Sequence, residues 1–141
     1  MADIKKSILM QNVIQTLINI SSRKTNQNNA INKMTNEISK LRNKYDFLRH
    51  VEIKDTRFIE LDEPVSVMSD LDNVRTDDVG NALYDIIKNM NNALGKDAGH
   101  FFVKEFRNII GEEYSSEIEN LGVDLGLIQL EIEVNEMSRK L

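Results

Sequence analysis

The chain has 141 residues, 40% hydrophobic and 29% charged, a composition that suits one small domain with an appendage or two small parts. It has no cysteine, which excludes disulfides, thiolate nucleophiles and Cys-ligated metal centres. Residues 1–50 hold nine Lys/Arg and three Asp/Glu, whereas residues 51–141 hold nine Lys/Arg and twenty Asp/Glu. Such asymmetry can indicate a basic arm for nucleic acid or an acidic partner, but we favour two halves that face each other.

Residues 4–20 are predicted to be helical, and from residue 10 onward apolar positions recur in alternating steps of three and four as far as residue 48. This is the a/d spacing of a coiled coil, which keeps one side of a helix facing a partner helix. Only two of its positions, Lys24 and Gln27, are polar. We therefore expect a long pairing helix whose apolar seam carries homo-oligomerisation. The seam consists of Met10, Val13, Leu17, Ile20, Ile31, Met34, Ile38, Leu41, Tyr45 and Leu48.

Residues 21–29 leave two interpretations of this segment open, because they contain no apolar side chain and are rich in Ser, Thr and Asn. In the first, one helix runs through, with Lys24 as a polar seam residue that fixes the register. In the second, the stretch is a loop and two helices fold back as a hairpin, since Asn and Ser favour caps and loops. The unbroken spacing across the stretch favours the continuous helix.

The middle of the chain changes character after residue 50. Residues 51–53 and 58–61 are predicted to be short strands, and residues 63–75 an acidic connector that contains the only proline. Three helices follow over residues 76–94, 97–110 and 112–121, the first capped by Thr76 and each closed by a glycine. Most of the aromatic residues lie between positions 84 and 114, which marks a small helical core there.

The last segment, residues 127–134, alternates apolar and polar side chains, which is the pattern of a half-buried strand. Its expected partners are the strands at 51–53 and 58–61. The rival interpretation is a helix that continues to residue 141.

Sequence motifs for metal binding, phosphate binding or catalysis are weak. The stretch from Asp70 to Asp78 resembles half of a calcium-binding loop but lacks the glycine and the last carboxylate, and His50 and His100 form no spaced ligand pair. Glycine-rich phosphate-binding motifs are missing from the sequence. We therefore expect no cofactor, no metal and no catalysis. A basic surface for nucleic acid is possible on the first fifty residues, spread around the helix rather than gathered on one face. It would consist of Lys33, Lys40, Arg42, Lys44 and Arg49.

Together these patterns predict a mainly α fold, with a coiled-coil oligomerisation segment (or helical hairpin) at residues 1–50 and a small acidic α(+β) domain at 51–141. The expected function is that of a cytoplasmic, homodimeric adaptor in a regulatory or signalling assembly, which binds a second copy and a protein partner. No stretch reaches the roughly 18 apolar residues of a membrane span. The alternatives are a nucleic-acid-associated regulator and a sensor with a small-ligand pocket among the aromatic helices.

Overall fold

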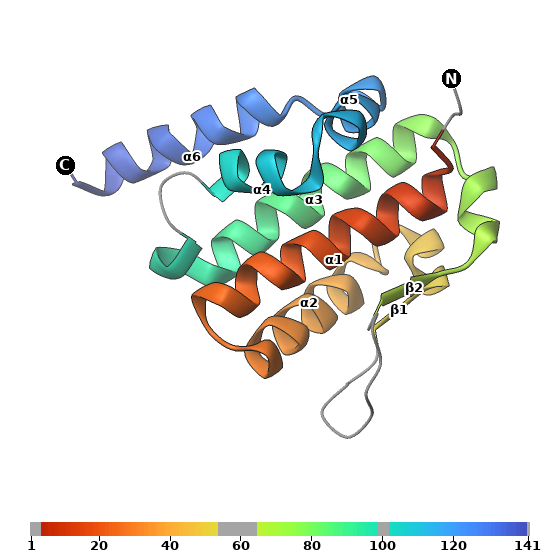
Figure 1. Ribbon diagram of the computed structural model, residues 1–141, viewed down its shortest axis with the longest axis horizontal. Helices are drawn as coiled ribbons and strands as arrows, with labels where there is room; N and C mark the ends of the chain where they lie inside the picture. The colour runs from red at the N-terminus through yellow and green to blue at the C-terminus, as the bar shows by residue number, and fades with distance from the viewer. Residues whose placement is uncertain (1–3, 54–64, 99–101, 141) are drawn as a thin grey trace.

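The computed structural model describes residues 4–53, 65–98 and 102–140, which form six α-helices and a two-stranded sheet (Figure 1). The prediction of a mainly helical fold with a minor β-hairpin is therefore confirmed. The elements are α1 (Lys6–Lys24), α2 (Gln27–Leu41), β1 (Val51–Ile53), β2 (Val65–Val67), α3 (Thr76–Leu94), α4 (Phe102–Ile110), α5 (Glu112–Asn120) and α6 (Leu125–Lys140), with short 3-10 helices η1 (Asp46–His50), η2 (Ser69–Asn73) and η3 (Gly95–Ala98).

α1 and α2 form a helical hairpin, so the continuous helix favoured by the sequence spacing is wrong and the hairpin interpretation is correct. The chain leaves the helix at Thr25, whose hydroxyl donates to the carbonyl of Ser21 at 2.8 Å. Asn26 then caps α2, because its side-chain oxygen accepts the backbone N–H of Asn29 at 2.8 Å. The polar side chains of this stretch therefore satisfy backbone groups at two helix ends, which a continuous helix would not need.

The hydrophobic core includes the residues that the sequence assigned to an oligomerisation seam. Nine of the ten are buried within the single chain, and Tyr45 is partly buried against the same core. α1 crosses the middle of the molecule and contacts α2, α3, α4 and α5 (Figure 1). Burial of these side chains within one chain accounts for the apolar spacing without a second copy. The same core cluster contains residues from both sides of position 50.

The C-terminal segment is the helix α6, so the predicted strand at 127–134 is wrong and its helical rival is correct. The misleading alternation has a simple origin. Ile128 and Ile132 lie one turn apart and face the core, whereas Leu130 and Val134 lie one turn apart and face solvent. Two opposite apolar stripes on one helix add up to the alternation expected of a strand.

The sheet pairs β1 with β2 in antiparallel fashion, with Val51 opposite Val67 and Ile53 opposite Val65. The strand predicted at 51–53 is confirmed, but its partner comes from the stretch interpreted as an acidic connector. The other predicted strand, at 58–61, lies outside the described residues. The buried valines Val51 and Val65 attach the hairpin to the core beside α1.

The two halves of opposite charge face each other within the chain, as we expected from the charge distribution. Lys24 pairs with Glu105 at 3.0 Å and Lys44 pairs with Asp85 at 2.9 Å. The ammonium of Lys33 donates to the backbone carbonyl of Ala93 at 3.1 Å. These contacts join α1, α2 and the turn after α2 to α3 and α4.

Gly80 brings α3 against the end of α5. A Cβ atom at this position would lie 2.2 Å from the carbonyl oxygen of Leu121. Only glycine permits this approach, because no Cβ atom tolerates a backbone oxygen at that distance. The turn that leads into α6 is positioned by this contact.

Candidate functional site

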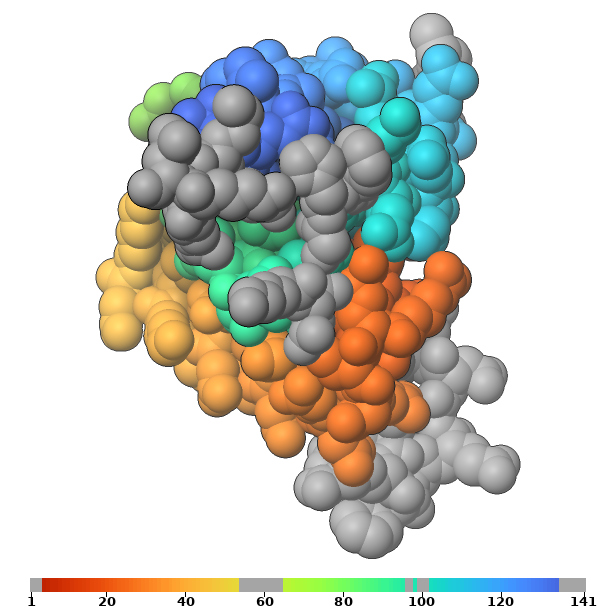
Figure 2. Space-filling view, turned by 90° about the vertical axis from the view of Figure 1, so that its left-hand side faces the viewer, coloured from red at the N-terminus to blue at the C-terminus, as the bar shows by residue number. Residues whose placement is uncertain are grey.

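The outer face of α3 carries the polar side chains that organise the candidate site. Tyr84 and Asp85 follow Asn81 by three and four residues, and Lys88 follows them by four and three, so the four lie along one side of the helix. None of the four is buried, whereas the opposite apolar face of α3 packs in the core. This face lies between the turn after α2 on one side and α6 on the other, as Figure 2 shows.

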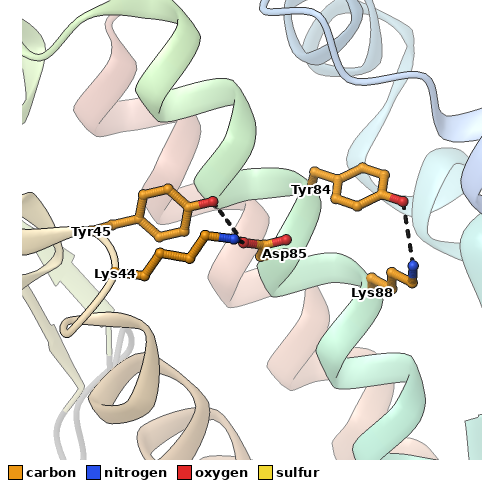
Figure 3. Close-up of polar contacts among 5 residues, drawn as sticks. All are labelled: Lys44, Tyr45, Tyr84, Asp85 and Lys88. Carbon is orange, nitrogen blue, oxygen red and sulfur yellow. Dashed lines mark hydrogen bonds and ion pairs between the residues drawn. The ribbon is translucent and has the colours of Figure 1, made fainter.

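Asp85 binds two groups from the turn that follows α2 (Figure 3). The Tyr45 hydroxyl donates to its Oδ2 atom at 2.6 Å, and the Lys44 ammonium donates to the same oxygen at 2.9 Å. The turn is held in place because Leu48, just beyond it, is buried in the core. The hydrogen bond to Asp85 raises the pKa of Lys44, and burial, followed by the bond to Asp85, raises the pKa of Tyr45.

Tyr84 and Lys88 connect α3 to α6 through Glu131. The Tyr84 hydroxyl donates to Glu131 Oε2 at 2.8 Å, and the Lys88 ammonium lies 3.2 Å from the same oxygen. The Lys88 ammonium also lies 3.5 Å from the Tyr84 hydroxyl (Figure 3). The hydrogen bond from Tyr84 and then that from Lys88 lower the pKa of Glu131, whereas the bond to Glu131 is the main cause of the raised pKa values of Tyr84 and Lys88.

A pocket of about 470 Å³ opens between α3 and the turn after α2. Its walls combine aromatic rings with carboxylates, and Lys44 is the one cation among the residues that line it. The rings of Tyr45 and Phe47 stand 5.8 Å apart, tilted by 50°. The lining residues are Lys44, Tyr45, Asp46, Phe47, Asp78, Asn81, Tyr84 and Asp85.

A second hollow, of about 350 Å³, lies between α3 and α6. Its apolar part is the outward stripe of α6, where Leu127, Leu130 and Val134 are 48%, 54% and 51% exposed. Lys88 and Glu131 complete its lining. We call these three apolar residues the α6 stripe. A surface helix ordinarily has one apolar face, and α6 has a second one.

The five basic residues that the sequence offered for nucleic acid each bind an acceptor of their own chain. Lys33 and Lys44 make the contacts with Ala93 and Asp85, and Arg42 donates to the Val51 carbonyl at 3.2 Å. Lys40 lies 3.7 Å from Glu37, and Arg49 pairs with Asp46. Carboxylates therefore partly neutralise Lys40, Lys44 and Arg49, whereas Lys33 and Arg42 bind neutral carbonyls and keep their charge.

The acidic stretch that resembles half of a calcium loop has a structural role at the start of α1. Asp72 accepts the backbone N–H of Ser7 at 2.8 Å, and this hydrogen bond lowers the pKa of Asp72. Among the described residues, no three side chains of the metal-binding types form a group that could hold a metal ion. His50 lies in η1, and His100 is outside the described residues.

The aromatic side chains of α4 fill the core, which agrees with the helical core expected between positions 84 and 114. Phe102 and Phe106 are fully buried, and they are not among the residues that line the two hollows beside α3. The pocket uses Tyr84 instead, together with Tyr45 and Phe47 from the first fifty residues. Sequence reasoning missed Tyr84, Asp85, Lys88 and Glu131 as a set; the polar spacing along 81–88 was a signal for the three residues on α3, and nothing in the sequence joined Glu131 to them.

No family model matches the chain, and neither the search of curated proteins nor the search of solved structures found a match. In the part of the chain that the structure describes, none of the helices has the length and apolar character needed to cross a membrane.

Proposed function

We propose that this protein is a non-catalytic adaptor that binds an amphipathic helix of a partner protein along the α6 stripe. The observation that carries the proposal is the α6 stripe itself, three large apolar side chains about half exposed on one face of one helix. Contiguous apolar surface of this kind marks interaction sites more often than scattered single residues do. Recognition of a helix in a groove uses apolar anchors at this spacing.

The charges beside the stripe define the chemistry of the partner. If Leu127 and Val134 are a positions and Leu130 is a d position, Glu131 falls at e and Glu133 at g, one on each side. Lys88 lies 3.2 Å from Glu131, and Gln129 donates to Glu133 at 3.3 Å, so both glutamates have partners in the chain while two carboxylates border the stripe. A second copy of α6 would bring glutamates near glutamates. A partner helix with Lys or Arg beside its apolar residues would instead be attracted, and we infer such a basic helix as the occupant.

The pKa shifts support a non-catalytic role. General acid–base catalysis needs a group whose pKa lies near neutrality. Among the residues that the structure describes, each resolved shift moves the group away from neutrality: the pKa values of the shifted lysines and tyrosines rise, and those of Asp72 and Glu131 fall. The proposal places the adaptor in the cytoplasm, with which the absence of cysteine is compatible.

The test uses designed peptides as probes. A fluorescent helical peptide with leucines at the a and d positions and lysines beside them is titrated with the full chain, and binding is followed by anisotropy. A second peptide carries glutamates in place of the lysines. We expect the basic peptide to bind and Leu130→Glu to weaken it by about tenfold or more, because burial of a leucine side chain contributes about 1.5–3 kcal/mol.

Met68→Glu is the matched control, because Met68 is also a large apolar residue and is 57% exposed, but it follows β2 and lies outside α6. It should leave binding of the basic peptide unchanged. Equal binding of both peptides, or equal loss in both variants, would contradict the proposal. Sedimentation of the unlabelled chain tests whether a second copy occupies the α6 stripe. A dimer that Leu130→Glu dissociates would assign the stripe to a second copy and would contradict binding of a different protein there.

A further inference from the structure

We propose a second, separate site: the pocket between α3 and the turn after α2 binds an organic cation, an ammonium or guanidinium group, between its aromatic rings and its carboxylates. The proposal does not depend on the α6 stripe, because the residues that form the two surfaces differ. The volume of the pocket, about 470 Å³, lies in the range of pockets that hold small molecules. The shape, the charge and an internal cation of the pocket each support it.

The aromatic walls come from two elements. Tyr45 lies just before η1 and Phe47 lies within it, whereas Tyr84 lies on α3. The rings therefore approach the pocket from different sides. All three side chains are partly buried, which holds each ring in place. A cation over the face of such a ring is attracted by the ring's quadrupole, and several rings together form the cages that bind quaternary ammonium groups.

The charge of the lining selects for a cation. Asp46, Asp78 and Asp85 contribute three carboxylates against the single ammonium of Lys44. Asp46 is paired with Arg49, and Asp85 is paired with Lys44. The Asp78 carboxylate forms no side-chain hydrogen bond or ion pair with any residue that the structure describes. One carboxylate at the pocket is therefore available to a ligand.

Lys44 shows that the pocket already holds an ammonium group. Its Nζ atom lies 5.2 Å from the centre of the Tyr45 ring and 2.9 Å from Asp85 Oδ2. A ring and a carboxylate thus bind the chain's own cation in the way proposed for the ligand. The Lys44 side chain is 64% exposed on a flexible four-carbon stem, so it can move aside when a cation with more apolar surface arrives.

The tyrosine ring resonances of the full chain provide the assay. The chain has three tyrosines, and Tyr114 serves as an internal control because its hydroxyl lies 3.5 Å from Asn12 of α1 and it is not part of the pocket. Choline is the first probe, its neutral isostere 3,3-dimethyl-1-butanol is the second, and sodium chloride controls for ionic strength. We expect choline to shift Tyr45 and Tyr84 with a Kd of about 1 mM and to leave Tyr114 unchanged.

Two variants change the charge of the pocket in opposite directions and test whether it prefers a cation. Lys44→Ala removes the competing ammonium and should tighten choline binding about fivefold, the factor for a like charge at about 4 Å in water. Asp78→Asn removes an attractive charge and should weaken binding by a similar factor. Both side chains are exposed, so both variants should fold. Weaker binding in Lys44→Ala, equal binding of the neutral isostere, or shifts caused by inorganic phosphate but not by choline would overturn the proposal.

The same chemistry can come from a small free amine or from a side chain of another protein, and two probes separate these sources. A short neutral peptide with one arginine is compared with choline. Tighter binding of the peptide assigns the pocket to a protein side chain, and tighter binding of choline assigns it to a free organic cation; both results support a cation site. If neither probe shifts Tyr45 and Tyr84, the site does not exist.

Discussion

Gly80→Ala tests the contact between α3 and the end of α5. In an exposed helix interior, this substitution stabilises a protein by about 1 kcal/mol, because alanine has the higher helix propensity. Here the new Cβ would lie 2.2 Å from the Leu121 carbonyl oxygen and 3.2 Å from its carbonyl carbon. Relief of the clash requires the backbone at the end of α5 to move by about 1 Å, if ordinary contact is to be restored.

The expected magnitude follows from two opposing terms. Overpacking of a well-filled site costs about 1–3 kcal/mol, and a clash with backbone belongs at the upper end because no side chain can rotate away. After the gain in propensity, the free energy of unfolding should fall by about 2 kcal/mol. With an m-value of about 2 kcal/mol/M, urea unfolding followed by circular dichroism would show a midpoint about 1 M lower at an unchanged m-value.

Gly126→Ala is the matched control, since Gly126 is also a helical glycine. Its added Cβ would meet only the side-chain oxygen of Asp124, at 3.3 Å. The free energy of unfolding of Gly126→Ala should therefore stay unchanged or rise by up to about 1 kcal/mol. If Gly80→Ala were as stable as Gly126→Ala, the end of α5 would not rest on α3 as described, and the reasoning would be refuted.

Three further predictions follow from the packing. Asp72→Ala should lower stability at neutral pH by about 1 kcal/mol through the lost cap of α1, and Asp70→Ala, in the same 3-10 helix, should not. Because Ser7 lowers the folded-state pKa of Asp72 from 3.8, its contribution is complete above about pH 4 and is lost as the pH falls through the lowered value, so unfolding of the Asp72 variant should depend less on acid. Met34→Ala should cost about 2–5 kcal/mol with a Tm independent of protein concentration, whereas a Tm that rises with concentration would indicate a seam between chains. The fragment 51–141, which lacks α1, should give the circular dichroism of a largely unfolded chain; a cooperative thermal transition of that fragment would contradict the single core.

Helices with one apolar face could be predicted from the sequence, but the expected cap of α3 is wrong: Thr76 is its first residue, and Arg75 at the cap position makes no side-chain capping hydrogen bond. The helix expected at 76–94 is α3 (Thr76–Leu94), because its apolar residues recur on one face and glycine ends it. The spacing favoured the continuous helix over the hairpin because hydrophobic spacing records burial and does not record what covers the buried face. Two helices of a hairpin can keep one phase by coincidence, and only the capping geometry of Asn26 separates the two arrangements.

The candidate site could not be predicted because it depends on contacts between distant residues. Tyr45 and Asp85 are 40 residues apart, and Tyr84 and Glu131 are 47 apart. Asp85, Tyr84 and Glu131 are each typical of a solvated helix face, and the apolar spacing assigned Tyr45 to the seam. The α6 stripe was visible only as half of an alternating pattern, and the burial of Ile128 and Ile132 was needed to separate the exposed half from the core half.

The central position of α1 has a consequence for synthesis of the protein on the ribosome. α1 is made first, yet the elements that cover it include α4 and α5, which begin at Phe102 and Glu112. At about 5–20 residues per second, translation needs roughly 5–20 s to produce these covers. During that interval the hairpin with α2 can cover only part of the apolar surface of α1. The nascent chain therefore exposes the apolar residues of α1 to chaperones and to neighbouring nascent chains until α4 and α5 have emerged.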